Sequence, residues 1–135
     1  THTQHTPRYV HCPWKVMTMN SLAIKHDTHN ALVLATAPLL MVVPFVLKFS
    51  PGIGLVSFMM GALIMAVALA GASPDRPLPL TAQSGFDWML GIGLVTIGLI
   101  AGLTTSNPAQ TIFLIGFGAA HLALTASTRY SSRSA

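Results

Sequence analysis

Charged residues are scarce in this chain of 135 residues, of which only 7% are Asp, Glu, Lys or Arg. A soluble domain usually carries about 25% charged residues, so a water-exposed surface would lack most of the groups that normally cover it. Hydrophobic residues make up 52% of the sequence. This composition excludes a disordered chain and a nucleic-acid-binding protein whose basic residues cover a folded surface. It places most of the chain in lipid.

Cysteine and catalytic motifs are also scarce. The single cysteine, Cys12, cannot form an internal disulfide, which excludes a small secreted domain held together by disulfides. The sequence has no Ser/His/Asp or Cys/His constellation, no paired carboxylates and no phosphate-binding glycine loop. We therefore predict no enzymatic activity, no catalytic residue and no metal site. Copper or zinc binding by the N-terminal histidines and Cys12 stays open, although their spacing matches no closed site.

Long apolar runs are the main feature that the sequence does have. A helix needs roughly 20 apolar residues to cross about 30 Å of hydrocarbon. Strands of a membrane barrel would instead alternate apolar and polar residues. The continuous runs predict an all-α integral membrane protein, a four-helix bundle made of two helical hairpins. The predicted crossings are residues 31–47, 52–72, 88–103 and 109–127, between an N-terminal arm (1–30) and a polar tail (128–135).

Lysine and arginine residues are distributed unevenly between the two sides of the predicted bundle. The cytoplasmic side of a membrane protein usually carries the excess. Only Lys48 falls on the side opposite the termini, whereas six residues share the side of the termini: Arg8, Lys15, Lys25, Arg76, Arg129 and Arg133. We therefore predict a bacterial inner-membrane protein with both termini in the cytoplasm. Its N-terminal arm would lie near anionic lipid headgroups, and no nucleic-acid partner is needed to explain the basic charge.

The two predicted hairpins resemble each other. A shift of 57 positions places Ser50-Pro51 on Asn107-Pro108 and Gly61-Ala62 on Gly118-Ala119. Both hairpins enter the membrane from the same side, so the repeat would be parallel rather than inverted. An alternative stays open, because turns between helices favour proline and membrane helices favour glycine and alanine whether or not a repeat exists.

Two segments carry a family resemblance. Residues 43–50 (Val-Pro-Phe-Val-Leu-Lys-Phe-Ser) resemble the Ser-Pro-Trp motif of small bacterial SPW-repeat membrane proteins, and residues 87–91 (Asp-Trp-Met-Leu-Gly) are similar to the opening of that repeat. Val43 and Phe45 stand where the motif has Ser and Trp, and Ala101 stands where the second hairpin would have Pro. The resemblance covers residues 31–127 and implies the paired-hairpin architecture rather than an activity.

Small residues recur at helical spacing in the predicted crossings. Helices in lipid associate through close packing of small side chains, because the hydrophobic effect contributes little there. These residues predict contacts within the bundle or with partner helices. The predicted packing residues are Gly54, Gly61, Gly91, Gly98, Gly102, Gly116 and Ala120. Pro38 and Pro44 predict a kink in the first helix, although membrane helices also tolerate proline without one.

The Asp, Lys and Arg side chains are predicted to lie outside the crossings. Asp87, beside Trp88, is interpreted as the interfacial start of the third helix. Pumps and secondary transporters normally place ionisable groups inside the membrane, so their expected absence here argues against ion coupling.

His121 is the one strongly polar side chain expected inside a crossing. Imidazole can ligate the central ion of a tetrapyrrole, and the small residues before it would let a flat macrocycle approach the helix. Residues 113–122 are similar to the bacteriochlorophyll-binding helix of light-harvesting polypeptides, although Phe117 stands where that helix usually has Ala. This resemblance implies bacteriochlorophyll or haem at His121. The alternative is a hydrogen bond between His121 and a helix neighbour such as Thr125.

The leading functional hypothesis is a non-catalytic accessory subunit of a larger bacterial membrane complex, most plausibly a photosynthetic or respiratory one. Its partners would be other integral membrane subunits in a hetero-oligomer, with lipids at its surface. A tetrapyrrole-binding, antenna-like protein that uses His121 is the second hypothesis. A small free-standing channel or transporter is the third.

Overall fold

Four long helices account for most of the chain in a computed structural model, which describes residues 25–75 and 77–130. They are α1 (His26–Val46), α2 (Pro51–Ala72), α3 (Leu80–Thr104) and α4 (Pro108–Ser127). Each is long and apolar enough to cross a membrane. The prediction of an all-α four-helix membrane bundle is confirmed. Most of the predicted N-terminal arm, and the tail beyond Tyr130, lie outside the described residues.

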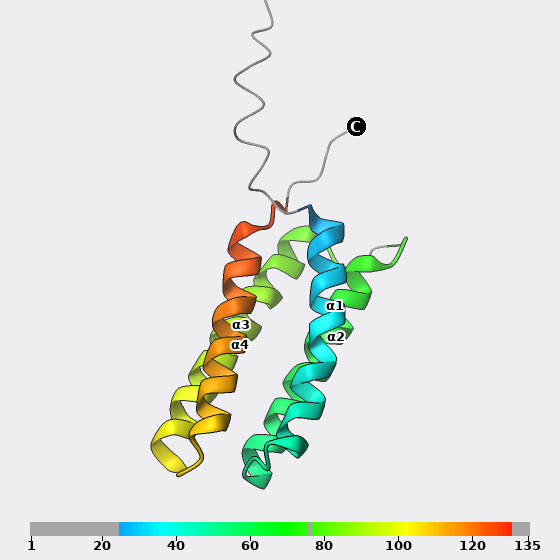
Figure 1. The fold of residues 1–135 in the computed structure, drawn as a ribbon. Helices are drawn as coiled ribbons and strands as arrows, with labels where there is room; N and C mark the ends of the chain where they lie inside the picture. Colours follow the sequence, from blue (N-terminus) through cyan, green and yellow to red (C-terminus); the bar gives the residue numbers. More distant parts are fainter. Residues whose placement is uncertain (1–24, 76, 131–135) are drawn as a thin grey trace, which may run out of the picture.

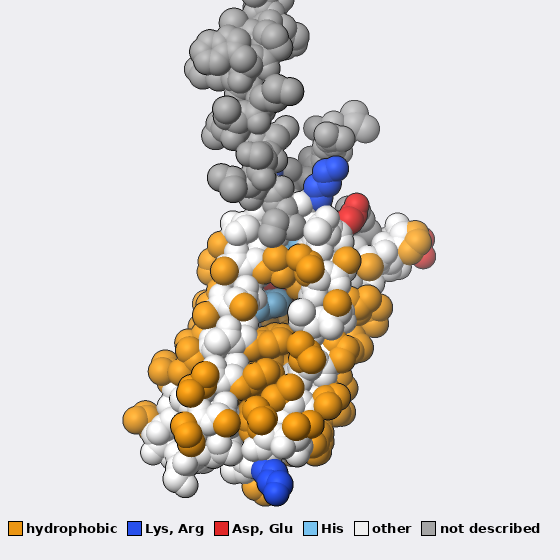
Figure 2. Space-filling model, viewed as in Figure 1, with side chains coloured by type: hydrophobic (Ala, Val, Ile, Leu, Met, Phe, Trp, Pro, Cys, Tyr) orange, Lys and Arg blue, Asp and Glu red, His pale blue; other side chains and the backbone are white. Residues whose placement is uncertain are grey.

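The helices form two hairpins (Figure 1). The main packing contacts join α1 to α2 and α3 to α4, whereas the hairpins touch each other less extensively, through α2 with α3 and α1 with α4. The start of α1 and the end of α4 lie at the same end of the bundle, and the two turns between paired helices lie at the other. Hydrophobic side chains cover most of the middle of the face shown in Figure 2, as expected for a surface in contact with lipid.

Proline starts the second helix of each hairpin. Pro51 and Pro108 occupy the first positions of α2 and α4, directly after Ser50 and Asn107. Proline suits this position because its fixed φ angle matches a helix and its missing N–H has no partner there in any case. The Asn107 side chain also accepts a hydrogen bond from the Ala109 N–H at 3.1 Å. Both turns are thus followed by a proline at the first helical position, at equivalent places in the repeat.

Most buried positions of the two hairpins coincide. All but one of the buried residues of α1 recur 54 positions later as buried residues of α3, and most of those of α2 recur 57 positions later in α4 or directly after it. At both helix crossings a glycine of the second helix faces a leucine of the first: a Cβ added to Gly61 would lie 3.1 Å from the Cβ of Leu40, and one added to Gly118 would lie 3.0 Å from the Cβ of Leu94. This correspondence supports a parallel structural repeat.

The predicted packing glycines fall into two groups. An added Cβ would lie 2.8 Å from Met41 at Gly61, 2.6 Å from Leu122 at Gly91 and 2.7 Å from Ile115 at Gly98, so these three allow close approach of paired helices. Gly102 and Gly54 are less tightly enclosed, with nearest atoms at 3.0 Å and 3.8 Å.

Two of the predicted packing residues face away from the described bundle. A Cβ on Gly116 would meet nothing within 4 Å, and Ala120 is exposed. The contact face of α4 carries Gly118 instead. Pro38 and Pro44, which predict a kink, both lie within α1, which is one continuous helix past them. Pro38 is exposed and Pro44 is buried.

The turn after α1 contains the only non-glycine residue with positive φ in the described part of the chain. Lys48 has a φ of 52°, and the Phe49 N–H donates to the Pro44 carbonyl at 2.9 Å. This bond, reaching back five residues past a left-handed position, is the pattern of a Schellman motif, which usually places glycine where Lys48 lies. The turn directs Phe49 against Phe113 of α4, with ring centroids 6.0 Å apart.

Two helices begin earlier than predicted. α1 begins at His26 rather than at residue 31, and α3 begins at Leu80 rather than at residue 88. The interpretation of Asp87 as the start of a helix is therefore wrong, since it lies about two turns inside α3 and is only 2% exposed. The first turns of α1 and α3 contain polar side chains that are buried against one another, and a search for apolar runs stops at such residues.

Candidate functional site

Polar side chains from three helices meet near the end of the bundle where α1 starts and α4 ends. Asp87 of α3, His29 of α1 and His121 of α4 are 2%, 0% and 5% exposed, respectively. Thr128 and Tyr130, which follow α4, complete the group. We call these five residues the Asp87 cluster. A histidine side chain is visible in the hollow between the hairpins in Figure 2.

Asp87 is the centre of this cluster. Its Oδ2 accepts a hydrogen bond from the Tyr130 hydroxyl at 2.8 Å and lies 3.3 Å from His29 Nε2. Its Oδ1 lies 3.9 Å from His121 Nε2. A carboxyl group inside a membrane protein is costly unless it is paired, and here each oxygen faces an imidazole nitrogen. One carboxyl thus connects α1, α3 and α4.

The hydrogen bonds of Thr128 determine which nitrogen of His29 carries a proton. The Thr128 hydroxyl donates its single proton to the Leu124 carbonyl at 2.7 Å, so it accepts from His29 Nδ1 at 2.8 Å. A neutral imidazole protonated at Nδ1 presents an unprotonated Nε2. That nitrogen faces a carboxyl oxygen of Asp87. A proton between His29 Nε2 and Asp87 Oδ2 would join these two groups, and the Tyr130 hydroxyl, 3.4 Å from the same nitrogen, is the other neighbour able to donate one.

A second polar layer lies next to the cluster. Gln83 Nε2 donates to Asn30 Oδ1 at 2.8 Å, and Asn30 Nδ2 lies 3.2 Å from His26 Nε2. Gly71 of α2 makes room for the Gln83 amide, because any side chain at this position would overlap it. The layer joins α1 to α3, so it adds to the connection between the two hairpins.

Several of these polar contacts join the two hairpins, which pack against each other less extensively than the helices within each hairpin do. His29 and Asn30 belong to the first hairpin, whereas Thr128, Asp87 and Gln83, which they contact, belong to the second or follow it. At the opposite end of the bundle, Gln110 Oε1 accepts from the Ser50 N–H at 3.1 Å. The residues buried between these two ends are largely apolar and include Leu40, Ile64, Leu94 and Leu114. Polar side chains thus join the hairpins at both ends of an apolar core.

His121 faces the interior of the bundle. Its Nε2 is buried without a hydrogen-bond partner and points toward Asp87, and its ring lies against α3 near Gly91. Thr125 donates to the backbone carbonyl of His121 at 2.9 Å, so the expected bond between Thr125 and the imidazole ring is not the one formed. A tetrapyrrole at His121 stays a prediction.

The prediction that no Asp, Glu, Lys or Arg lies well inside a crossing is wrong, because Asp87 lies within the candidate span of α3. A second histidine, His29, lies within the span of α1. The argument against ion coupling that rested on this absence no longer applies. One signal in the sequence could have indicated the correct position. Asp87 precedes Gly91 by four residues, and residues four apart share a helix face, so the predicted packing face of Gly91 includes Asp87.

Tyr130 lies just beyond α4, and its burial should make the stability of the protein depend on pH in the alkaline range. Burial, followed by the hydrogen bond to Asp87, raises the pKa of Tyr130 above its usual value of 10.0. Asp87, His29 and His26 are the titratable groups that face it. Above about pH 10 the unfolded chain loses the tyrosine proton while the folded protein keeps it, so the stability from this group falls as pH rises.

We therefore expect the stability advantage of the wild type over Tyr130→Phe to shrink from about pH 10 upward. Unfolding midpoints of both proteins in the same detergent, recorded across this range, provide the measurement. The comparison removes the contributions of lysines, which titrate in both proteins. An advantage that stays constant at high pH would contradict the described burial of Tyr130.

Comparisons with known proteins add no family to this geometry. Among the described residues, no group of three or more His, Cys, Asp or Glu side chains is arranged to hold a metal ion. The SPW-repeat and light-harvesting resemblances stay predictions. No protein-family model, no curated protein and no solved structure matches the chain, so its function must be argued from the Asp87 cluster.

Proposed function

We propose that this protein is a proton-binding accessory subunit of a larger membrane complex, which takes up and releases a proton at the Asp87 cluster and catalyses no reaction. The observation that carries the proposal is the burial of Asp87 between His29 and His121. Ionisable groups inside membrane proteins are rare and usually functional. Stability alone is a weak explanation, because well-packed apolar residues often replace a buried ion pair without loss.

The position of the cluster supports proton binding from one side of the membrane. Tyr130, which follows α4, and His26, at the start of α1, lie on the side of Asp87 that faces the nearer end of the bundle. Toward the middle of the bundle, Leu94 and Leu114 are fully buried and offer no polar group to carry a proton further. A proton therefore enters and leaves at the same end. This geometry favours a subunit that responds to protonation over one that moves protons across the membrane.

Protonation would act through the connection between the hairpins. The proton shared by His29 and Asp87 joins α1 to α3, and its loss would leave a lone pair facing a carboxylate. Deprotonation therefore weakens the attachment of one hairpin to the other and changes the surface offered to partner helices. The setting that we propose is an energy-transducing complex of a bacterial inner membrane, with integral membrane partners and both termini in the cytoplasm.

The test is an infrared pH titration of the full chain in lipid nanodiscs. We expect a carboxyl signal that titrates in the wild type and is absent in Asp87→Asn, because the amide can accept from Tyr130 and donate to His29 but cannot exchange a proton. Asp75→Asn is the matched control, since Asp75 is exposed in the loop between the hairpins and its loss should leave the Asp87 signal in place. An unchanged signal in Asp87→Asn would refute the proposed site.

Two further measurements address the subunit role. Native purification in a gentle detergent should recover partner subunits at fixed stoichiometry, with a yield that depends on pH in the wild type and not in Asp87→Asn. Liposomes that contain only this chain should show no proton flux. A proton flux that is present in the wild type and absent in Asp87→Asn would indicate that the protein transports protons rather than acting as an accessory subunit.

His121 supports a second candidate function, tetrapyrrole binding. Its buried Nε2 has no hydrogen-bond partner, as an axial ligand requires. This nitrogen faces Asp87 at 3.9 Å inside the bundle, so a tetrapyrrole would fit only if α3 and α4 moved apart. The visible spectrum of the natively purified protein tests this directly. A pigment band that disappears in His121→Ala would support the second function, whereas a colourless, folded preparation would reject it.

A further inference from the structure

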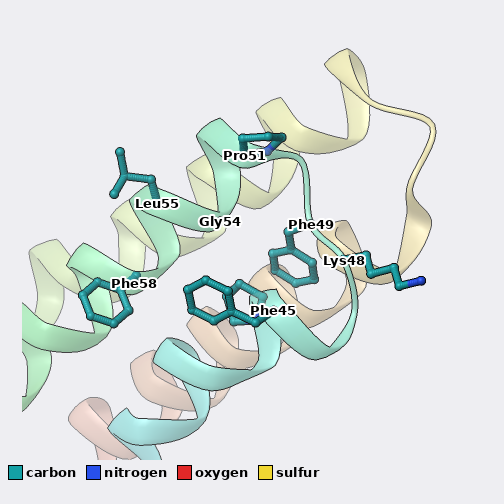
Figure 3. Close-up of a pocket in the computed structure, with 8 residues that line it drawn as sticks. Phe45, Lys48, Phe49, Pro51, Gly54, Leu55 and Phe58 are labelled. Atoms are coloured by element: carbon teal, nitrogen blue, oxygen red, sulfur yellow. The ribbon is translucent and has the colours of Figure 1, made fainter.

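An open groove lies beside the turn between α1 and α2, at the end of the bundle opposite the Asp87 cluster (Figure 3). Its volume is about 480 Å³. Phe45 and Phe58 form one part of its wall, and Leu55, Gly54 and Lys48 also line it. None of these residues contributes to the Asp87 cluster, so the groove is a separate feature with its own chemistry.

The walls of the groove are apolar and exposed. Phe45 is 72% exposed and Leu55 is 64% exposed. The rings of Phe45 and Phe58 meet edge to face with centroids 6.4 Å apart. Gly54 lies at the floor of the groove, where an added Cβ would make ordinary contact with Pro44 and Phe49 at 3.8 Å, so a longer side chain there would extend into the groove. This shape accommodates a flexible hydrocarbon chain lying against the first hairpin.

A single positive charge lies at the edge of the groove. Of the charged side chains in the described residues, Lys48 alone lies at this end of the bundle, and its amine extends away from the phenylalanines in Figure 3. The first turn of α2 begins next to it at Pro51, and a helix start adds partial positive charge. An anionic group held here would therefore have its apolar part directed into the groove.

We propose that this groove binds one anionic phospholipid, with an acyl chain against Phe45 and Phe58 and the headgroup phosphate at Lys48. The proposal is independent of the proton-binding function. Burying an acyl chain gains little inside a bilayer, since the surrounding lipid is equally apolar. Selectivity must therefore come from the contact of Lys48 with the headgroup, while the groove supplies the shape.

The experiment is native mass spectrometry of the full chain, titrated with phosphatidylglycerol or phosphatidylcholine that carries identical acyl chains. One cationic side chain near a membrane surface contributes about 1 kcal/mol toward anionic lipid, so we expect phosphatidylglycerol to bind about fivefold more tightly, at one lipid per chain. Soluble glycerol phosphate is the second arm and should not compete, because it has the headgroup chemistry without the acyl chain.

Three variants separate the two halves of the site. Lys48→Asn should remove the preference for phosphatidylglycerol and keep the turn intact, since asparagine tolerates positive φ. Gly54→Leu should fill the groove and reduce binding of both lipids. Gly116→Leu is the control, because its new side chain would face open space on α4, and it should bind as the wild type does.

Several outcomes would overturn the proposal. Equal affinity of the wild type for the two lipids would show that Lys48 does not select an anionic headgroup. Unaltered binding in a correctly helical Gly54→Leu protein would place the lipid elsewhere. Competition by glycerol phosphate would indicate a phosphate site without an acyl-chain contribution, and absence of any retained lipid would show that the groove does not bind lipid.

Discussion

Replacing Asp87 by leucine is expected to lower the free energy of unfolding by about 3 kcal/mol, because a buried polar network that loses one partner keeps the desolvation cost of the others. The Tyr130 hydroxyl and the facing nitrogens of His29 and His121 would all lose their carboxyl partner. Asp87→Asn should cost only about 1 kcal/mol, since its amide accepts from Tyr130 and donates to His29 Nε2.

The measurement is detergent-induced unfolding of each variant from mixed micelles, followed by loss of helical signal. Asp75→Leu serves as the control, because Asp75 is exposed and its removal should change stability by less than about 0.5 kcal/mol. Equal losses for Asp87→Leu and Asp87→Asn would mean that the hydrogen-bonding capacity of residue 87 does not stabilise the bundle, contrary to the geometry of the cluster.

Replacing Gly118 by leucine is expected to cost about 3 kcal/mol and to separate α3 from α4. An added Cβ would lie 2.9 Å from the backbone nitrogen of Val95 and 3.0 Å from the Cβ of Leu94. Backbone atoms cannot move aside as the end of a side chain can, so the helices must move apart, and overpacking of this kind costs roughly 1–3 kcal/mol or more. The separation would also displace His121, the next buried residue of α4.

Gly116→Leu provides the matched comparison on the same helix. Its Cβ would meet nothing within 4 Å, so we expect stability to change by less than about 0.5 kcal/mol. Crosslinking of cysteine pairs placed across α3 and α4 would report the separation directly. If both variants unfolded alike, the close crossing at Gly118 would not be a determinant of the fold.

The helices and their pairing could be predicted from the sequence because lipid-facing segments leave a strong hydropathy signal. Each of the four apolar runs contains residues that are exposed in the isolated bundle, such as Phe45, Leu55, Met89 and Ile112. Proline and polar residues mark the turns clearly, as Ser50 and Pro51 show. These signals require no knowledge of which side chains touch.

The candidate site could be predicted only in part. His121 stood out because it lies inside an apolar run, but Asp87 and His29 lie just before the predicted apolar runs, where polar residues usually meet water. Their burial depends on mutual hydrogen bonding and on the neighbouring hairpin. Satisfied polar groups of this kind carry no hydropathy signal of their own, so the meeting of three helices at this cluster becomes evident only in the structure.

The sequence also did not indicate which face of each helix packs against its neighbour. Gly116 and Gly118 are two residues apart, which corresponds to about 200° around a helix and therefore to opposite sides. Composition alone makes both of them candidates for helix packing. Only the crossing with α3 distinguishes the buried Gly118 from the open Gly116.

The matched burial of the two hairpins shows which positions of the scaffold accept either an apolar or an ionisable side chain. The positions in the first hairpin that correspond to Asp87 and His121 are Val33 and Ile64, both buried and apolar. The first hairpin places its own ionisable group, His29, one turn earlier, at the position that corresponds to Gln83 of the second. Each hairpin thus supplies ionisable side chains to the cluster from different positions of the same packing pattern.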